Sequence, residues 1–554
     1  MQPIWLEHYP QGISPTINPD QYANIAEMFD ISCKKFSSTV AYSNMGANLT
    51  YKELHSRAES FAAFLQSRGL VAGDRIAIQM PNLLQYPVVL FGALKAGLIV
   101  VNTNPLYTAK EMQHQFSDSG IKAIVILENF ADKLETVLKE NKIPTIITTQ
   151  IGDFLPPLKK HLVNFVVKKI KKMVPPFHIP SATPLLETLK IGSQLTFSPV
   201  SMKIADIAFL QYTGGTTGVS KGAMLTHRNI LSNMEMIYSW ISKTLKENEE
   251  TIVTALPLYH IFSLTVNCLA FTKLGGTNLL ITNPKDIPGF VSTLRKERFT
   301  VFTGVNTLFN ALMNHPDFTS IDFSNLKVSV AGGMALQQSV AERWKKLTKT
   351  PIAEGFGLTE TSPVVACNPI DGTEKVGTIG PPLPSTDVLL IDDEGNEVSL
   401  GDRGELCIAG PQVMAGYWNR PEETAQSMID GKWLKTGDIA TIDEHGYLKI
   451  VDRKKDMILV SGFNVFPNEV EDAIAKHPDV LEVAAIGLPD EKSGEIVKVF
   501  VVPKKQDLTA EEIIEFSKQD LVAYKRPKYV EFRKELPKTN VGKILRRALK
   551  EESA

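Results

Sequence analysis

Short β-rich runs alternate with helical patterns along most of this chain, and this alternation limits its fold more than any other feature. The runs are RIAIQM from residue 75, AIVIL from 123, TIITT from 145, IAFLQYT from 207, FTVFTGV from 299 and LKVSVAGG from 326. Strands that alternate with helices form parallel sheets covered by helices. The chain is therefore predicted to be an α/β protein.

The pattern changes twice toward the C-terminus. Residues 375–450 contain short strand-like runs and turn sequences such as DDEGNE and DEHGY, which indicates a small β-subdomain. After residue 452 a helix, two strand-like runs and a second helix follow, which is typical of a separate α+β domain of about a hundred residues. Because 554 residues exceed what one core usually supports, we predict domains over 1–452 and 453–554.

Composition excludes several classes of protein. Lys and Arg number 59 against 61 Asp and Glu, so no overall basic charge favours nucleic acid, and any anion must be bound locally. Cys33, Cys268, Cys367 and Cys407 lie far apart, which argues against a zinc site or a disulfide scaffold and fits a reducing cytosol. The first residues lack a basic stretch followed by an apolar one, so we expect a cytoplasmic protein.

Two apolar segments require separate interpretation. Residues 87–101 are too short to span a bilayer and contain Lys95, so a buried helix running into a strand is expected. Residues 159–176 predict a basic amphipathic helix that ends at Pro175. Its apolar face would comprise Leu162, Phe165, Val166, Ile170 and Met173, with Lys160, Lys168, Lys171 and Lys172 opposite. Either a solvated surface helix or reversible attachment to an anionic membrane surface fits this pattern.

A loop rich in glycine and hydroxyl side chains, YTGGTTGVSKGAMLTH, covers residues 212–227. Backbone N–H groups of such a loop can converge on a phosphate, and Lys221 can supply a positive charge. The lysine lies between Ser220 and Gly222 rather than before Ser or Thr, so the Walker A motif is excluded. An ordinary surface loop is the alternative.

Four further segments are weak signals when taken singly. EGFGLTE, residues 354–360, combines small residues that permit close approach with a carboxylate suited to Mg²⁺. Asp438 could accept hydrogen bonds from ribose hydroxyls, and Arg453 could donate to ribose or phosphate oxygens. Lys543 follows a glycine in a basic stretch near the terminus. Each of these charges is also compatible with a solvated surface.

Taken together and in order, the segments resemble the acyl-adenylate-forming (AMP-binding) superfamily, and are most similar to bacterial long-chain fatty acid–CoA ligases. The segments are YTGGTTGVSKGAMLTHRN, LPLYHIF, EGFGLTE, GYWNRPEET, WLKTGDIA, DRKKDMILVSGFNVFPNEVE and PKTNVGKILRR. The resemblance covers nearly the whole chain. It implies an N-terminal adenylation domain of two parallel-sheet α/β subdomains plus a small β-subdomain, followed by a small mobile α+β lid domain.

The resemblance implies a ligase that joins a long-chain fatty acid to CoA through an acyl-AMP, using ATP and releasing pyrophosphate and AMP. The phosphates of ATP would be held by Thr213, Gly214, Gly215, Thr216, Thr217, Gly218 and Lys221. Adenine would be bordered by Gly333, Gly355, Phe356 and Gly357, with Thr359 at the α-phosphate. Glu360 would bind Mg²⁺, Asp438 and Arg453 would bind the ribose, and Lys543 would stabilise the charge that develops during adenylation.

The resemblance also implies a moving lid. Lys455 matches the hinge position, and rotation there would replace Lys543 with a loop in which Gly462 leaves room for the pantetheine arm of CoA. A static linker is the alternative. His260 matches a residue near the acyl carboxylate, where either an orienting or a structural role fits. Leu264 stands where one long-chain relative has a tryptophan gate, so the gating of the acyl tunnel is left open.

Several alternatives stay open. They are a medium-chain or aryl acid ligase, a module that loads a carrier protein, a luciferase-like oxygenase and a non-catalytic nucleotide- or lipid-binding protein. No carrier module follows residue 554, and the joint presence of Lys543, Glu360 and Asp438 favours catalysis. The expected location is the cytoplasm, with peripheral contact to the inner face of the cytoplasmic membrane through 159–176. Chain-length preference and oligomeric state, including a homodimer, are left open.

Overall fold

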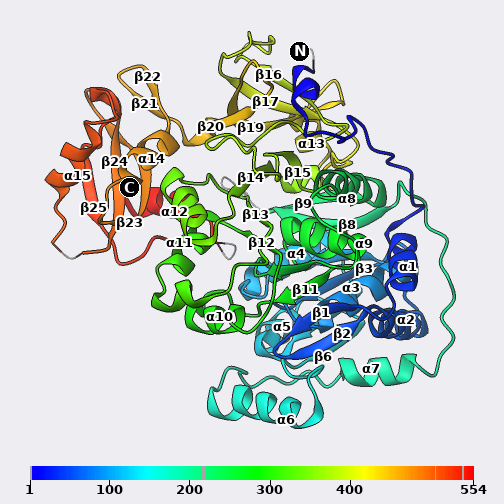
Figure 1. Ribbon diagram of the computed structural model, residues 1–554. Helices are drawn as coiled ribbons and strands as arrows, with labels where there is room; N and C mark the ends of the chain where they lie inside the picture. Colours follow the sequence, from blue (N-terminus) through cyan, green and yellow to red (C-terminus); the bar gives the residue numbers. More distant parts are fainter. Residues whose placement is uncertain (1–2, 214–219, 506, 540–541, 554) are drawn as a thin grey trace.

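The chain forms a large body and a smaller C-terminal domain beside it (Figure 1). The computed structural model describes residues 3–213, 220–505, 507–539 and 542–553. Of the residues expected to bind phosphate, Gly214, Gly215, Thr216, Thr217 and Gly218 lie outside this described part.

The first sheet of the body is parallel except at one edge. Its spatial order is β7 (Ala182–Pro184), β6 (Thr145–Thr149), β5 (Ala123–Leu127), β3 (Arg75–Gln79), β4 (Ile99–Asn102), β8 (Ile207–Thr213) and β9 (Lys221–Thr226). β8 and β9 pair antiparallel, with Thr213 opposite Lys221. The strands predicted from residues 75, 123, 145 and 207 are confirmed. The described residues 212–213 and 221–226 of the predicted glycine-rich loop thus lie in two paired strands at the edge of this sheet.

The second sheet has a parallel centre with an antiparallel strand at each edge. Its order is β15 (Val364–Cys367), β14 (Ile352–Gly357), β13 (Val328–Ala331), β12 (Val301–Gly304), β10 (Thr251–Thr254), β11 (Thr277–Leu280), β1 (Val40–Asn44) and β2 (Ala47–Thr50). The strands predicted from residues 299 and 326 are β12 and β13. Two parallel-sheet subdomains therefore make up most of the body, as predicted.

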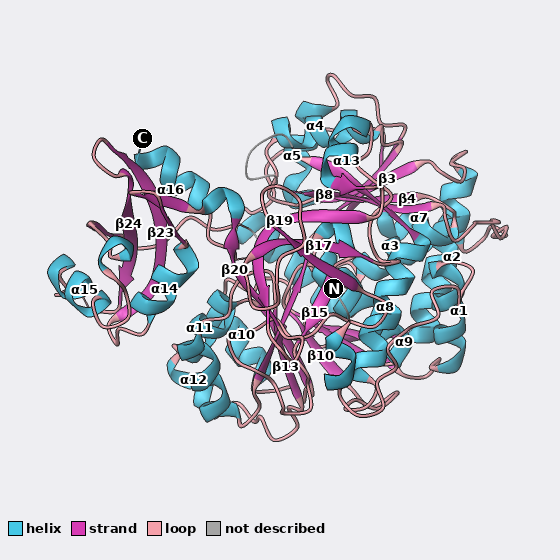
Figure 2. Ribbon diagram, turned by 90° about the horizontal axis from the view of Figure 1, so that it is seen from above, coloured by secondary structure: helices cyan, strands magenta, loops and turns pink. Residues whose placement is uncertain are grey.

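Helices cover these sheets (Figure 2). They are α1 (Ile25–Lys35), α2 (Tyr51–Ser67), α3 (Gln85–Lys95), α4 (Ala109–Ser119), α5 (Ala131–Val137), α7 (Leu185–Gly192), α8 (His227–Ile241), α9 (Ala270–Leu274), α10 (Ile287–Leu294), α11 (Asn306–Met313) and α12 (Gln338–Thr348). The helix α6 (Pro157–Phe165) has no buried residue and projects from the body (Figure 1). The apolar segment 87–101 is a buried helix, α3, leading into β4, as predicted. Lys95 is buried in that helix. Its charge is compensated there, because its amino group lies 2.5 Å from Asp30 and 3.5 Å from Glu59.

The small β-subdomain is antiparallel. It contains β16 (Asp387–Ile391), β17 (Gly404–Ala409), β18 (Met428–Ile429), β19 (Trp433–Ile442) and β20 (Leu448–Arg453), with the short helix α13 (Pro421–Ser427) before β18. β20 ends at Arg453, and a short helical turn, Lys454–Asp456, leads into the C-terminal domain. The domain boundary between residues 452 and 453 stays a prediction.

The C-terminal domain is built on a mostly antiparallel sheet. It comprises β21 (Ile458–Val460), β22 (Phe463–Val465), β23 (Val480–Asp490), β24 (Gly494–Pro503) and β25 (Tyr529–Phe532), with α14 (Pro467–Ala475), α15 (Ala510–Ser517) and α16 (Arg546–Ser553). It touches the body beyond the connecting chain, because Asn310 donates to the backbone oxygen of Leu481 at 3.0 Å and Thr307 donates to that of Gly542 at 3.0 Å.

The basic segment 159–176 differs from its predicted form. The α-helix α6 ends at Phe165, one π-helical turn follows over Val166–Ile170, and the chain leaves the helix at Lys172, before Pro175. Its predicted apolar face does not pack on the body: Leu162 is 63% and Ile170 is 64% exposed. No helix among the described residues is long and apolar enough to span a membrane.

Candidate active site

A single cavity of about 2670 Å³ brings together most of the residues singled out in the sequence. It lies between the body and the C-terminal domain and extends into the body. The expected site residues that line it are Thr213, Lys221, His260, Gly333, Gly355, Phe356, Gly357, Thr359, Glu360, Asp438, Arg453, Lys455 and Lys543. Side chains from three sheets and two domains therefore share one space.

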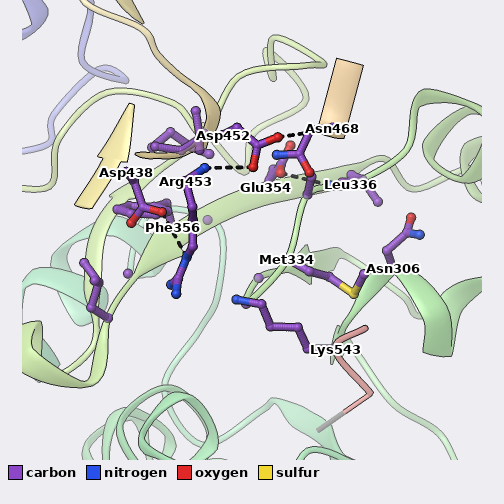
Figure 3. A pocket seen from close by; sticks show the side chains of 18 of the residues that line it. Asn306, Met334, Leu336, Glu354, Phe356, Asp438, Asp452, Arg453, Asn468 and Lys543 are labelled. Atoms are coloured by element: carbon purple, nitrogen blue, oxygen red, sulfur yellow. Dashed lines mark hydrogen bonds and ion pairs between the residues drawn. The ribbon is translucent and has the colours of Figure 1, made fainter. Parts of the chain in front are cut away.

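Asp438 and Arg453 form an ion pair in this cavity. The residues lie opposite each other on β19 and β20, and Arg453 Nε is 3.2 Å from Asp438 Oδ1 (Figure 3). Asp438 Oδ2 is buried and has no hydrogen-bond partner among the described residues. Burial raises the pKa of Asp438, and Arg453 opposes this shift. A buried carboxylate oxygen without a donor is costly, so this atom marks a place where a ligand's hydroxyl groups would bind.

Lys543 enters the cavity from the C-terminal domain (Figure 3). Its backbone N–H donates to Thr539 Oγ1 at 3.1 Å and its carbonyl accepts from the N–H of Thr539 at 2.7 Å. The hydrogen bond from Thr307 to the carbonyl of Gly542 attaches the residue before Lys543 to α11. Burial, followed by the charge of Arg453, lowers the pKa of Lys543 to about 8. The ammonium group is thus mainly charged at neutral pH.

His260 lies on the body side of the same cavity. Burial, followed by the charge of Lys543, lowers the pKa of His260 to about 4, so the imidazole is neutral at physiological pH. Its Nδ1 accepts from the backbone N–H of Phe262 at 3.3 Å. The neutral ring therefore carries its proton on Nε2, which can donate a hydrogen bond.

The EGFGLTE segment forms another wall of the cavity. It contains the end of β14 and a short helical turn that begins at Thr359. Gly357 has no room for a side chain, since an added Cβ would lie 2.0 Å from the carbonyl oxygen of Pro363. Gly355 has ordinary space around it, and Gly333 adopts φ +80°. Sequence reasoning missed Glu354: burial raises its pKa to about 8, and it accepts from the N–H of Leu336 at 3.0 Å.

Sequence reasoning also missed the roles of Tyr417, Arg420 and Glu423, although GYWNRPEET was among the quoted segments. Tyr417 donates to Glu360 Oε1 at 2.7 Å, and Lys221 forms an ion pair with Glu423. All of these side chains line the cavity. Spacing alone could not find them, because the contacts with Glu360 and Lys221 join segments that are far apart in the sequence.

Part of the cavity lining is apolar and belongs to one hydrophobic cluster of the body. It consists of Ile237, Trp240, Ile241, Val266, Val364, Cys367 and Ile370. Ile237, Trp240 and Ile241 lie on one face of α8, whose start is set by a reciprocal cap in which Thr226 Oγ1 accepts from the N–H of Asn229. The helical spacing was visible in the sequence, but a core helix has the same pattern.

Among the described residues, Gly462 is the predicted site residue that the structure does not bring to the cavity. It connects β21 and β22 at φ +83°, and an added Cβ would meet no atom within 4 Å. Phe463 beside it is 55% exposed and stacks on Tyr524 at 4.7 Å between ring centroids. The proposed role of Gly462 therefore requires another orientation of the C-terminal domain.

Comparison with known proteins identifies the class. The chain matches the AMP-binding enzyme family over residues 29–418 and the AMP-binding enzyme C-terminal domain over 469–543. The protein belongs to this family of AMP-binding enzymes.

Particular relatives narrow the comparison. The chain is 55% identical to the long-chain-fatty-acid–CoA ligase of Escherichia coli O157:H7, over 100% of this chain and 99% of that protein. It is 40% identical to the enzyme of the same name from Bacillus subtilis strain 168, over 100% and 98%.

Solved structures agree with this fold. The ATP-bound enzyme MatB of Rhodopseudomonas palustris superposes with a TM-score of 0.81 at 28% identity, over 96% of this chain and 99% of MatB. An anthranilate CoA ligase in complex with anthranoyl-AMP superposes with a TM-score of 0.85 at 24% identity, over 97% and 99%, which supports the fold alone.

Proposed function

We propose that this protein is an ATP-dependent long-chain fatty acid–CoA ligase that works through an acyl-AMP intermediate. The observation that carries the proposal is one cavity with two kinds of wall. Asp438, Arg453 and Lys543 supply charge at one part, and α8 supplies an apolar wall at another. A nucleotide and an acyl chain need these two environments side by side.

In the first half-reaction a carboxylate oxygen of the fatty acid attacks the α-phosphorus of ATP. A new C–O–P linkage forms and the bond to pyrophosphate breaks, so the carboxylate becomes a mixed anhydride in which AMP is a good leaving group. Lys543 would offset negative charge between the two anions, in a site where burial strengthens the interaction. The Nε2–H of neutral His260 would orient the acyl carboxylate.

Separate sets of residues would hold the ribose, the adenine and the phosphates of the nucleotide. The unpartnered Oδ2 of Asp438 would accept from a ribose hydroxyl, and Arg453 would donate to the sugar or to phosphate. Gly333, Gly355, Phe356 and Gly357 would border adenine, and Thr359 would contact the α-phosphate. Thr213 and Lys221 would hold the other phosphates.

Mg²⁺ fits the carboxylate of Glu360, because this ion favours one or two carboxylates together with substrate phosphates. Glu360 Oε1 is positioned by the hydroxyl of Tyr417 at 2.7 Å. When bound, the ion would neutralise phosphate charge.

In the second half-reaction the thiol of CoA displaces AMP and forms the thioester. We infer that the C-terminal domain turns at Lys455 for this step, so that Gly462 faces the cavity in place of Lys543. The exposed Phe463–Tyr524 stack supports this proposal, because an apolar pair is left in water in the present orientation.

The experiment that tests the function is pyrophosphate release with free acids of increasing chain length, with and without CoA. Release with palmitate, followed by palmitoyl-CoA formation only when CoA is present, is the expected result. Preference for benzoate or octanoate would favour an aryl or medium-chain ligase. Nucleotide binding without release of pyrophosphate would favour a non-catalytic protein.

We further propose that the enzyme is cytoplasmic and that the segment 159–176 attaches it reversibly to the inner face of the cytoplasmic membrane. Leu158, Leu162, Phe165, Ile170 and Met173 are all at least half exposed, and no residue of α6 or of the following turn is buried. Lys168, Lys169, Lys171 and Lys172 lie in the same segment. Exposed apolar side chains flanked by lysines fit the interface of an anionic bilayer. Formation of a homodimer, which the sequence leaves open, is checked separately by sedimentation velocity.

A further inference from the structure

The strand β9, which begins at Lys221, pairs with a segment that is not a strand of the first sheet. Residues 415–418 run antiparallel to β9: Met224 donates to the carbonyl of Gly416 at 2.8 Å, and Trp418 donates to that of Gly222 at 2.8 Å. The chain then enters α13, with Arg420 at its N-cap. Backbone hydrogen bonds therefore hold Lys221 next to Tyr417 and close to the first turn of α13.

The carboxylate of Glu423 lies close to two cationic side chains, Lys221 and Arg420. It forms an ion pair with Lys221, whose amino group also lies 5.0 Å from the centroid of the Tyr417 ring. Arg420 Nε is 3.6 Å from Glu423 Oε1, and Arg420 Nη2 is 3.8 Å from Asp118. Lys221, Tyr417, Arg420 and Glu423 all line the cavity. Glu423 thus occupies an anion position between two cations of the site.

A helix-capping role does not account for this contact. Glu423 lies in the first turn of α13, where acidic residues are generally favourable, but no side chain caps the N-terminus of this helix. Glu422 lies in the same turn and is exposed. The two neighbouring glutamates therefore share the effect of the helix and differ in the contact with Lys221.

We propose that Glu423 is an internal counter-anion that competes with the polyphosphate of the nucleotide for Lys221. This inference rests on the proposed function. The lysine and glutamate side chains are each 36% exposed, so the pair is accessible and weak enough to exchange. A polyphosphate carries several charges and can replace the carboxylate, whereas an anion with a single charge competes poorly. Glu423 would thereby lower the affinity for nucleotide and pyrophosphate and raise selectivity for multiply charged ligands.

The test compares Glu423→Gln with Glu422→Gln, which removes the same charge from the same helical turn. Binding of magnesium pyrophosphate to the full-length protein is measured by isothermal titration calorimetry. We expect E423Q to bind about two- to fivefold more tightly than the wild type, the range for loss of an exposed ion pair. E422Q should bind like the wild type, and both variants should have wild-type thermal stability.

A second pair of variants separates the contact from general charge effects. In a Lys221→Gln background, E423Q should give no gain in affinity, because the competing pair is already absent. Equal binding by E423Q and E422Q, weaker binding by E423Q, or an undiminished gain without Lys221 would each overturn the inference alone. A wild-type protein that binds neither ATP nor pyrophosphate would reject the proposed function together with the inference.

Discussion

Lys543 of the C-terminal domain and His260 of the body face the same cavity, and the charge of Lys543 adds to burial in lowering the pKa of His260. Lys543 itself has its pKa lowered to about 8 by burial and by Arg453. At neutral pH the cavity therefore holds a charged lysine beside a neutral imidazole. Because Lys543 belongs to the C-terminal domain and His260 to the body, the two residues share the cavity only while the C-terminal domain keeps the present orientation.

The first prediction concerns the pH dependence of adenylation. If the charged form of Lys543 is required, acyl-AMP formation at subsaturating substrate should fall as pH rises through about 8, because the free enzyme loses that proton there. In Lys543→Arg this decline should move to much higher pH, since a guanidinium keeps its proton. Single-turnover acyl-AMP formation across pH measures both.

Lys543→Ala provides the complementary control. It should slow acyl-AMP formation by roughly 10²- to 10³-fold, as expected for loss of one charge contact in the transition state. Thioester formation from pre-made acyl-AMP should largely persist, and the exposed-residue variant Lys534→Ala should behave like the wild type. Equal damage to both half-reactions, or an unchanged pH profile in K543R, would contradict the assigned role.

The second prediction concerns nucleotide affinity. Asp438→Asn removes the carboxylate charge while keeping nearly the same shape, so ATP should bind about tenfold or more weakly because a charge-assisted hydrogen bond is lost. Equilibrium binding of ATP measures the change. Asp430→Asn is the control, because Asp430 is exposed in a turn preceding the same strand. Unchanged ATP binding by D438N would reject the ribose assignment.

The third prediction concerns the thiol step. Gly462→Leu should leave pyrophosphate release intact and block thioester formation, so that acyl-AMP accumulates, because the leucine side chain would obstruct the pantetheine arm. Gly395→Leu is a matched control, since Gly395 also has positive φ, +86°, with no atom within 4 Å of an added Cβ. Loss of pyrophosphate release in G462L alone would show that the loop acts in adenylation instead.

The fourth prediction concerns the acyl chain. Ile241→Trp enlarges a partly exposed side chain on the cavity face of α8. We expect kcat/KM for palmitate to fall while that for octanoate is kept, because a shorter chain does not reach the added ring. Ile191→Trp, on the exposed surface of α7, should change neither value. A proportional loss for both acids would indicate general disturbance of α8 and not a tunnel.

The fifth prediction concerns membrane attachment. Joint replacement of Lys168, Lys169, Lys171 and Lys172 by Glu should weaken binding to anionic vesicles, because each lysine near such a surface contributes about 1 kcal/mol. Vesicle sedimentation at low and high salt measures this binding, which salt should weaken. Activity on octanoate should be kept.

Leu162→Ser with Phe165→Ser tests the apolar part of the same contact. This double variant should also reduce vesicle binding, with less dependence on salt, because it removes exposed apolar area and no charge. Equal sedimentation of the wild type and both variants would leave the segment as a solvated helix.

Much of the fold follows from the sequence, because a strand or helix depends on the pattern of neighbouring residues. The runs that predicted β3, β5, β6, β8, β12 and β13 alternate with helical segments, and a parallel α/β arrangement is the result. The ordered motifs likewise predicted that distant residues such as Glu360, Asp438 and Lys543 belong to one site, and all three line the same cavity.

Tertiary structure decided which side chains meet and which face water. The sequence predicted an apolar face in segment 159–176, but it could not tell whether that face is buried. In the tertiary structure Leu162 and Ile170 are exposed to solvent. The pairing of Lys221 with Glu423 depends on two segments brought together across a long stretch of chain, and the lack of a partner for Asp438 Oδ2 depends on what packs around it. Local pattern cannot encode such contacts, because the same helix or strand can pack in more than one way.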